Sequence, residues 1–189
     1  MKLPILAYGH PVLRQKCEDI PRSYPKLKQL ISDMWETLYA ANGAGLAAPQ
    51  IGKAIRLFIV DTVQDYRNSS IDERKMFITD KGIRETFINP VILEKGGSLW
   101  VESEGCLSIP KLQFDIERKL SVAIKYYDEN FEEKEGVFSG VTARAVLHEY
   151  DHIEGVLFTD YVNEDLYREQ VDKISRGDVK VKYRMKFFK

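Results

Sequence analysis

The 189-residue sequence predicts an α+β fold in which antiparallel or mixed β-sheets pack around a central α-helix. Strand-like segments gather between residues 55 and 138, whereas helical periodicity is confined to the stretches on either side. This segregation favours α+β over a repeating βαβ plan. The length suits one domain with a substantial core, and the sequence contains no internal repeat.

An amphipathic helix is predicted before the first strand. Its apolar positions follow helical spacing and are Leu27, Leu30, Ile31, Met34 and Leu38. Pro25 suits its first turn, and Asn42-Gly43 ends the pattern. Residues 55–61 are rich in branched and aromatic side chains and predict a buried strand. The polar stretch at residues 62–84 is too long for a simple connection, so it holds local structure or is mobile, and we assign it no function.

The remaining elements follow in order. The predicted strands are residues 86–94, 98–109, 120–127 and 131–138, the last two forming a hairpin. Asp128-Glu129-Asn130 supply the turn of that hairpin. The central helix is predicted at residues 140–154 and ends near Gly155, and a shorter helix is predicted at residues 164–174.

Charge and composition limit the classes of partner. The chain has 28 basic and 29 acidic residues, so its net charge of -1 gives no overall field that attracts nucleic acid or a membrane surface. No apolar run reaches bilayer length, and the N-terminal segment lacks the hydrophobic stretch of a signal peptide. Cys17 and Cys106 are too few for a disulfide framework. We therefore expect a cytoplasmic protein.

The central helix contains the segment LHEYDHIEG, with two of the three histidines of the chain. His148 and His152 are four residues apart, so their rings leave the same face of a helix, as two ligands of one cation require. Glu149 lies about 100° around the helix, where a carboxylate could take a proton from metal-bound water. The alternative is two surface histidines with an unrelated glutamate.

Two histidines leave a catalytic metal ion short of one protein ligand. The candidates for the third are Asp160, Glu164, Glu169, His10 and a cysteine. Cys106 lies in EGCLSIP, where Gly105 lets the backbone approach another group closely. A lone cysteine is more often a small buried apolar residue than a ligand, so these residues alone leave the choice open.

Three motifs together resemble the signatures of the peptide deformylases: GAGLAAPQ at residues 43–50, EGCLS at residues 104–108 and HEYDH at residues 148–152. Smaller similarities are GHPVLR at residues 9–14, NPVI at residues 89–92, and Arg118. The resemblance implies a catalytic domain at residues 1–162. Residues 163–189 are then a C-terminal helix and a basic, strand-like extension of the same domain.

The resemblance implies that Cys106, His148 and His152 bind one divalent metal ion on the central helix. Fe2+ is the ion expected in the cell, with Zn2+, Ni2+ or Co2+ as alternatives, and a thiolate with two imidazoles suits all four. The implied activity is hydrolysis of the N-formyl group of formylmethionine at the start of nascent polypeptides, with release of formate. Glu149 is then the general base and acid. The Gln50 side-chain amide and the Leu107 backbone N–H are the expected oxyanion donors.

The resemblance also implies a cleft for an extended peptide. Gly43 and Gly45 would let the peptide lie against the backbone, as would Gly105. The methionine pocket is expected to have Val141 and Ala145 as its floor and Ile109 as a wall. Ordinary core packing is the alternative for all three apolar residues.

The positions of three charged residues near these motifs also suggest what their side chains do. Arg144 lies on the same side of the helix, which is unexpected for an apolar pocket, and its long side chain could extend outward to solvent. Glu104 and Asp151 are expected to orient the metal ligands or to pair with an arginine such as Arg118. Solvated surface positions are the alternative for both carboxylates.

The C-terminal segment shows strand periodicity with one basic face. Its apolar residues are Val179, Val181, Tyr183, Met185 and Phe187, and they alternate with Lys180, Lys182, Arg184 and Lys186. We favour an edge strand protected by lysine. Contact with ribosomal RNA, as made by the C-terminal element of some peptide deformylases, and sheet addition between two chains are the alternatives. The predicted partners are formylmethionyl nascent peptides, with no membrane and no specific nucleic-acid sequence.

Two other functions stay open on sequence alone. The first is a zinc peptidase in which Glu164 or Glu169 is the third ligand and EGCLS is accidental. The second is a non-catalytic protein that holds formylated peptide ends, against which the presence of Glu149 and Gln50 argues.

Overall fold

The computed structural model describes residues 1–188 and has helix α4 at its centre. The strands are β1 (Ile5–Leu6), β2 (Gly45–Ala47), β3 (Leu57–Asp61), β4 (Arg84–Cys106), β5 (Ile109–Tyr127), β6 (Glu133–Ser139) and β7 (Met185–Lys186). The α-helices are α1 (Leu27–Ala41), α2 (Val63–Asn68), α3 (Ile71–Arg74), α4 (Gly140–Ile153) and α5 (Arg168–Arg176). Short 3-10 helices are η1 (Pro11–Arg14), η2 (Ala48–Ile51), η3 (Lys75–Phe77), η4 (Phe158–Tyr161) and η5 (Glu164–Leu166).

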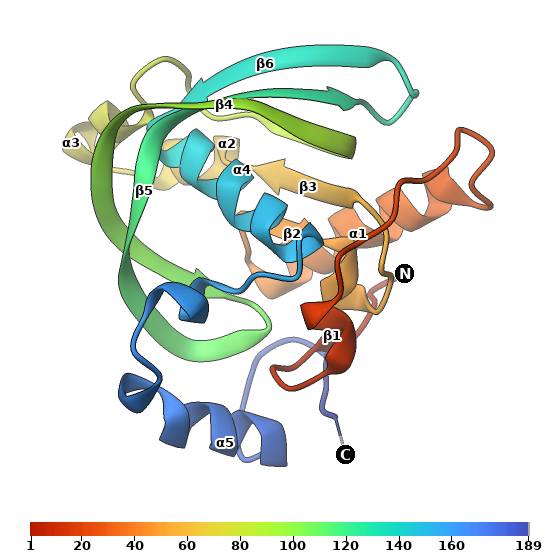
Figure 1. The fold of residues 1–189 in the computed structure, drawn as a ribbon, viewed down its shortest axis with the longest axis vertical. Coiled ribbons are helices and arrows are strands. Elements are labelled where there is room, and N and C mark those ends of the chain that lie inside the picture. The colour runs from red at the N-terminus through yellow and green to blue at the C-terminus, as the bar shows by residue number, and fades with distance from the viewer. Residues whose placement is uncertain (189) are drawn as a thin grey trace.

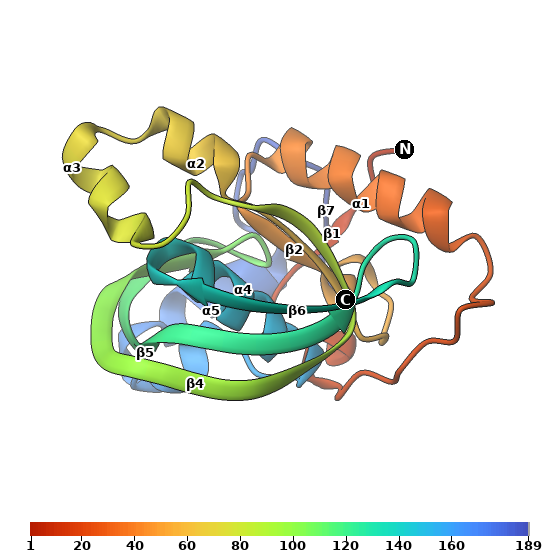
Figure 2. The same cartoon turned by 90° about the horizontal axis from the view of Figure 1, so that it is seen from above.

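The strands form two sheets, and the larger one curves around α4. Five antiparallel strands have the order β2-β3-β4-β5-β6, and β1 pairs with β7 in a separate parallel pair. In Figure 1, β4 and β5 curve around one side of α4 while β2 and β3 lie on the other side. Figure 2 shows α1, α2 and α3 along one flank of the molecule, with the long β4–β5 hairpin along the opposite flank. The predicted α+β class with a central helix is confirmed.

Helix α4 is buried because it packs against strands from both sides. Its apolar residues Ala143, Val146, Leu147 and Ile153 share one core cluster with Phe58 of β3, Phe87 of β4 and Ile124 of β5. Burial of this apolar surface fixes the rotation of α4 about its axis. The histidine face of α4 is thereby held toward the end of β4.

The β4–β5 hairpin differs from the prediction. The two strands expected at residues 86–94 and 98–109 are one continuous strand, β4, and its pairing with β5 has four register shifts. One shift spans Gly96 to Leu99, and Gly97 has a positive φ of 77° there. The glycine pair therefore bends the ladder instead of ending it, as a β-bulge does.

The first helix begins later than Pro25 because Lys26 has a left-handed backbone and precedes the first helical residue, Leu27. At its other end Asn42 adopts the left-handed conformation of a helix C-cap. Beyond β3, the polar stretch at residues 62–84 forms α2, α3 and η3. Within residues 1–188, no helix is long and apolar enough to cross a membrane. The cytoplasmic location stays a prediction.

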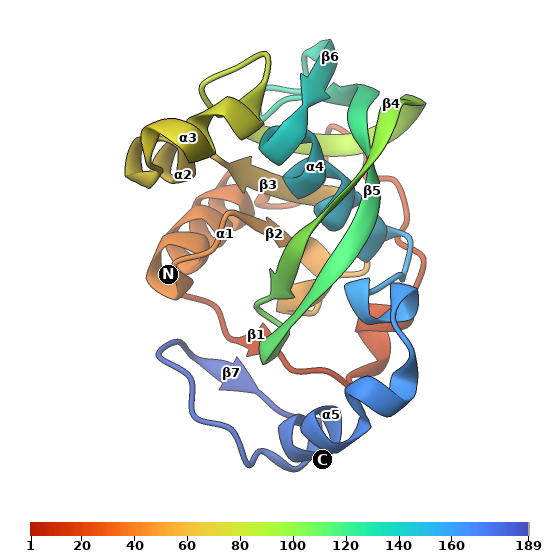
Figure 3. The same cartoon turned by 90° about the vertical axis from the view of Figure 1, so that its left-hand side faces the viewer.

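The strand expected after Gly177 is wrong for most of its length, because only Met185 and Lys186 form a ladder, with β1. The alternation in burial is nevertheless present. Val179, Tyr183, Met185 and Phe187 pack on the core, while Lys180, Lys182, Arg184 and Lys186 are exposed. Figure 3 shows this C-terminal tail, residues 178–188, running beside β1 after α5.

Candidate active site

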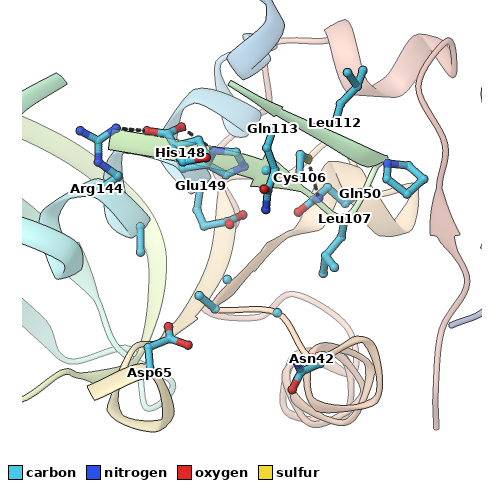
Figure 4. A pocket seen from close by; sticks show the side chains of 18 of the residues that line it. Asn42, Gln50, Asp65, Cys106, Leu107, Leu112, Gln113, Arg144, His148 and Glu149 are labelled. Carbon is cyan, nitrogen blue, oxygen red and sulfur yellow. Dashed lines mark hydrogen bonds and ion pairs between the residues drawn. The ribbon is translucent and has the colours of Figure 1, made fainter. Parts of the chain in front are cut away.

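Three side chains converge between α4 and the end of β4. The ligand atoms of Cys106, His148 and His152 all lie within 4.8 Å of one another. Cys106 Sγ is 3.2 Å from His152 Nε2. Figure 4 shows Cys106 and His148 on neighbouring parts of the cavity wall. Among residues 1–188 this is the group of histidine, cysteine and acidic side chains arranged to hold a metal ion.

Local structure explains this arrangement. His148 and His152 are one helical turn apart on α4, so their rings project from the same face. Cys106 is the last residue of β4, and it pairs with Ile109 across a two-residue turn. The hairpin thus brings the thiol to the helix face from a segment 42 residues away from His148 (148 − 106).

The donor set fits a first-row transition metal ion. A thiol and two imidazoles are the soft and borderline ligands of zinc, iron, nickel or cobalt, whereas calcium and magnesium prefer oxygen. The Nδ1 atom of His148 is 3.1 Å from Glu104 Oε2, which leaves its Nε2 atom for the ion. Cys106 and His148 also line the cavity, so a bound ion would remain accessible to substrate.

Glu149 faces the same cavity from the next position on α4. Its side chain is almost enclosed, with the residue 4% exposed, and burial raises the pKa of its carboxyl to about 7. Its Oε2 atom has no hydrogen-bond partner within the described residues. The carboxyl is therefore free to contact a water molecule or a substrate.

Gly45 leaves the space that Glu149 occupies. A Cβ atom on Gly45 would lie 2.4 Å from Glu149 Oε1, closer than real contacts allow. Gly43 is similarly restricted, because its Cβ would lie 2.8 Å from Leu107 Cδ1. Both glycines line the cavity, yet within the protein they are required by side-chain packing as well as by any peptide that lies against them.

Gly45→Ala should therefore displace Glu149 and lower kcat for the reaction of this site. We expect roughly a 100-fold loss, because a misplaced proton-transfer group loses most of its contribution. Gly96→Ala is the matched control, since its Cβ would meet Ser121 Oγ at 3.0 Å and Glu94 Oε1 at 3.8 Å, both at the ends of side chains. Steady-state kinetics on both metal-loaded variants test this expectation, and a Gly45→Ala enzyme with normal kcat would contradict it.

Gln50 is held with its amide group directed at the cysteine. Its Oε1 atom accepts a hydrogen bond from the Ala47 N–H at 2.8 Å, which leaves Nε2 directed toward Cys106 Sγ at 3.6 Å and Ser108 Oγ at 3.3 Å. Gln50 is 1% exposed and lines the cavity. A buried side-chain amide and the backbone of Leu107 thus flank the metal ligands.

The cavity has a volume of about 830 Å³. Its lining includes the predicted positions Gly43, Gly45, Gly105, Val141 and Ala145. Ile109 was predicted as a wall, but it is not a lining residue. It is 0% exposed and packs with Cys106 and Phe158 in the core behind the metal ligands. Strand β5 begins at Ile109, and the pleat turns its side chain inward.

A buried network of charges supports His148. Glu104 accepts hydrogen bonds from Arg118 Nε at 2.6 Å and from Arg144 Nη1 at 2.6 Å, and Arg118 Nη1 donates to Asp151 at 2.7 Å. Burial opposes ionisation of Glu104, but the hydrogen bonds from His148 and Arg118 lower its pKa to about 2. Glu104 and Asp151 are therefore buried partners of Arg118 and not surface carboxylates.

Arg144 does not extend outward to solvent, contrary to the orientation considered from the sequence. It is 7% exposed, and its guanidinium donates to the backbone carbonyls of Trp100 and Ile116 as well as to Glu104. The guanidinium also lies over the Trp100 ring, 4.5 Å from its centroid. Pairing with a buried carboxylate offsets the desolvation that would otherwise drive the side chain outward.

Arg118→Met should lower the free energy of unfolding by roughly 3–5 kcal/mol, because it leaves Glu104 and Asp151 buried without their main cation. Urea denaturation of the metal-free protein measures this effect without contributions from metal binding. Arg67→Met, on the exposed surface of α2, should change stability by no more than about 0.5 kcal/mol. Equal stabilities for the two variants would show that the buried network contributes little.

The carboxylates considered for a peptidase lie elsewhere. Glu164 and Glu169 are exposed, and they pair with Arg168 and Lys173 respectively. His10 caps the 3-10 helix η1 through its Nδ1 atom. None of the three belongs to the group around Cys106.

Several lining residues were not anticipated from the sequence, among them Asp65, Lys111, Gln113 and Tyr183. Their positions depend on long-range folding, since Tyr183 comes from the C-terminal tail and Asp65 from α2. Ser108 was also missed, although it lies within the EGCLS motif. The alternation of the tail predicted that Tyr183 faces inward, but not what it faces.

Comparison with known proteins agrees with this geometry. Residues 2–166 match the family model described as polypeptide deformylase. The chain is 46% identical over 191 residues to the peptide deformylase of Christiangramia forsetii, covering 99% of this chain and 96% of that relative. A peptide deformylase structure from Ehrlichia chaffeensis aligns with a TM-score of 0.83 and 27% identity, covering 94% of this chain and 97% of that one. One from Thermotoga maritima aligns with a TM-score of 0.72 and 34% identity, covering 86% and 99%.

Proposed function

Because the chain belongs to the peptide deformylase family, and so is a metal-dependent hydrolase that removes the N-formyl group from nascent polypeptides, we propose how its own residues perform that reaction. Cys106, His148 and His152 hold one divalent ion, with Fe2+ as the ion used in the cell. The observation that carries this assignment is the grouping of their ligand atoms within 4.8 Å beside Glu149 and Gln50. Metal analysis of protein purified without oxygen tests the choice of iron.

When bound, such an ion supplies Lewis acidity at the formyl group and its attacking water. Glu149 accepts the proton of that water and later delivers one to the departing amine, since it lines the cavity and its Oε2 atom has no hydrogen-bond partner within the described residues. The Gln50 Nε2 group and the Leu107 N–H donate hydrogen bonds to the formyl oxygen as it gains negative charge. The Ala47 hydrogen bond orients Gln50 for this purpose before substrate arrives.

The methionine side chain of the substrate packs on Val141 and Ala145 of α4. These residues line the cavity on the same helix that carries His148, and the small Ala145 leaves room for the side chain. The peptide that follows methionine lies along the backbone at Gly43 and Gly105, both of which line the cavity. Formylmethionyl nascent chains are therefore the proposed partners.

A deformylase and a peptidase differ in the bond that they hydrolyse, which is the N-formyl amide bond in the first and an internal peptide bond in the second. The metal-loaded protein is incubated with formyl-Met-Ala-Ser and, separately, with acetyl-Met-Ala-Ser, and the products are identified by mass spectrometry. We expect free Met-Ala-Ser and formate from the first peptide and much slower reaction of the second, since the extra methyl group must fit beside Gln50 and Leu107. Cleavage between methionine and alanine would overturn the proposal.

We also propose that the exposed basic side chains of the C-terminal tail contact ribosomal RNA. The support is that Lys180, Lys182, Arg184 and Lys186 are exposed in one short segment. Binding to purified ribosomes should weaken in the quadruple glutamine variant and with rising salt, because phosphate contacts release counterions. Unchanged binding by that variant would contradict the proposal. It would favour the alternative that the four basic side chains prevent the strand edge from pairing with another chain.

A further inference from the structure

The C-terminal tail reaches the catalytic turn, defined as residues 106–109. Tyr183 lines the same cavity as Leu107 and Glu149. Its hydroxyl donates a hydrogen bond to the Leu107 carbonyl oxygen, with 2.6 Å between the oxygens. The tail thus contacts the residue whose N–H is the proposed donor to the formyl oxygen.

Backbone pairing fixes the tail in this position. The Ile5 N–H donates to the Arg184 carbonyl at 2.8 Å, directly after Tyr183. The next part of the N-terminal segment reaches the catalytic turn itself, because the Tyr8 N–H donates to the Ser108 carbonyl at 2.8 Å. Two successive carbonyl groups of the turn, those of Leu107 and Ser108, are therefore held from outside the hairpin.

We propose that Tyr183 is a positioning residue for the Leu107 N–H, and that the tail is thereby part of the active site. The inference rests on the proposed role of that N–H as a donor to the formyl oxygen. The carbonyl and N–H of Leu107 are joined through its own φ and ψ, so fixing the carbonyl restricts the direction of the donor. A donor of this kind contributes most when it is aligned before charge develops.

Tyr183 also has a simpler role as an anchor for the tail, and its ring packs against the core cluster that contains Leu38 and Leu46. Tyr183→Phe separates the two roles because it keeps the ring and removes only the hydroxyl. Tyr24→Phe is the matched control. The Tyr24 ring packs against the same cluster, and no hydrogen bond of its hydroxyl is found within residues 1–188.

The first readout is the kinetics of formate release by the two metal-loaded variants. We expect Tyr183→Phe to lower kcat roughly three- to tenfold with KM within about twofold of wild type, since one hydrogen bond to the turn is lost and no substrate contact is removed. Tyr24→Phe should match wild type. An unchanged kcat in Tyr183→Phe, or a change confined to KM, would overturn the inference.

The second readout observes the donor directly. Labelling with cysteine carbonyl 13C and leucine 15N selects one amide, because Cys106-Leu107 is the one Cys-Leu pair in the sequence. In zinc-loaded protein this amide resonance should shift in Tyr183→Phe and stay in place in Tyr24→Phe. A resonance that does not move in Tyr183→Phe would contradict the positioning role. Failure of wild type to release formate would instead overturn the proposed function, so the two failures are distinguishable.

Discussion

Replacing Glu149 with alanine should lower kcat for formate release by roughly a thousandfold while the metal content stays at one ion per chain. Glu149 lines the cavity beside the ligand group, and its Oε2 atom has no hydrogen-bond partner within the described residues. General acid-base groups contribute about 10²- to 10⁴-fold. Its neighbours cannot replace it, because Glu104 is committed to Arg118, Arg144 and His148. Formate assays on samples of measured metal content give the comparison.

The control for this variant is Glu135→Ala, on the exposed surface of β6. It makes the same chemical change outside the cavity lining and should keep wild-type kcat. If Glu149→Ala loses its metal, the kinetic comparison is repeated with Glu149→Gln, which preserves the volume beside Gly45. A metal-loaded glutamine variant with more than about a tenth of wild-type kcat would show that Glu149 is not the proton carrier.

Replacing Cys106 with serine should weaken metal binding by at least about 100-fold. Loss of a residue that merely orients a ligand costs 10- to 100-fold, so loss of the thiolate itself should cost more. The His148 and His152 rings would keep their positions on α4, but two imidazoles alone form an incomplete site. Competition with a chromogenic chelator measures the affinity for zinc.

Cys17→Ser is the matched control for the cysteine variant. Cys17 is also buried, and burial raises the pKa of its thiol to about 11, but it lies in a different core cluster from Cys106. The control should keep its metal even if its stability falls. Glu164→Gln and Glu169→Gln should also keep it, whereas metal loss in either of them with retention in Cys106→Ser would favour the peptidase arrangement.

Local sequence patterns predicted the elements that carry chemistry. Spacing of four residues placed His148 and His152 on one face of a helix, and α4 has them there. The spacing could not identify the third ligand, because Cys106 approaches through the β4–β5 turn. Only the order of three motifs, through their resemblance to a family, selected the cysteine. The predicted fold class and family are confirmed, while the individual roles of these residues remain proposals.

The predictions that were wrong share one physical cause. Each depended on contacts between residues that are distant in the sequence. Arg144 is buried because Glu104 and two backbone carbonyls receive its guanidinium. Ile109 faces the core because β5 starts at that residue and fixes its orientation. The alternation in the C-terminal tail predicted its burial pattern, but the tail finds a strand partner only where β1 lies beside it. None of these partners is close in sequence.

We propose that this chain hydrolyses the formyl group through the metal centre formed by Cys106, His148 and His152. The most direct measurement is formate release from formyl-Met-Ala-Ser by protein purified without oxygen and loaded with Fe2+, beside the same protein stripped of metal. We expect rapid release by the loaded protein, none by the stripped protein, and recovery when metal is restored. No release by protein that contains one ion per chain would contradict the proposal.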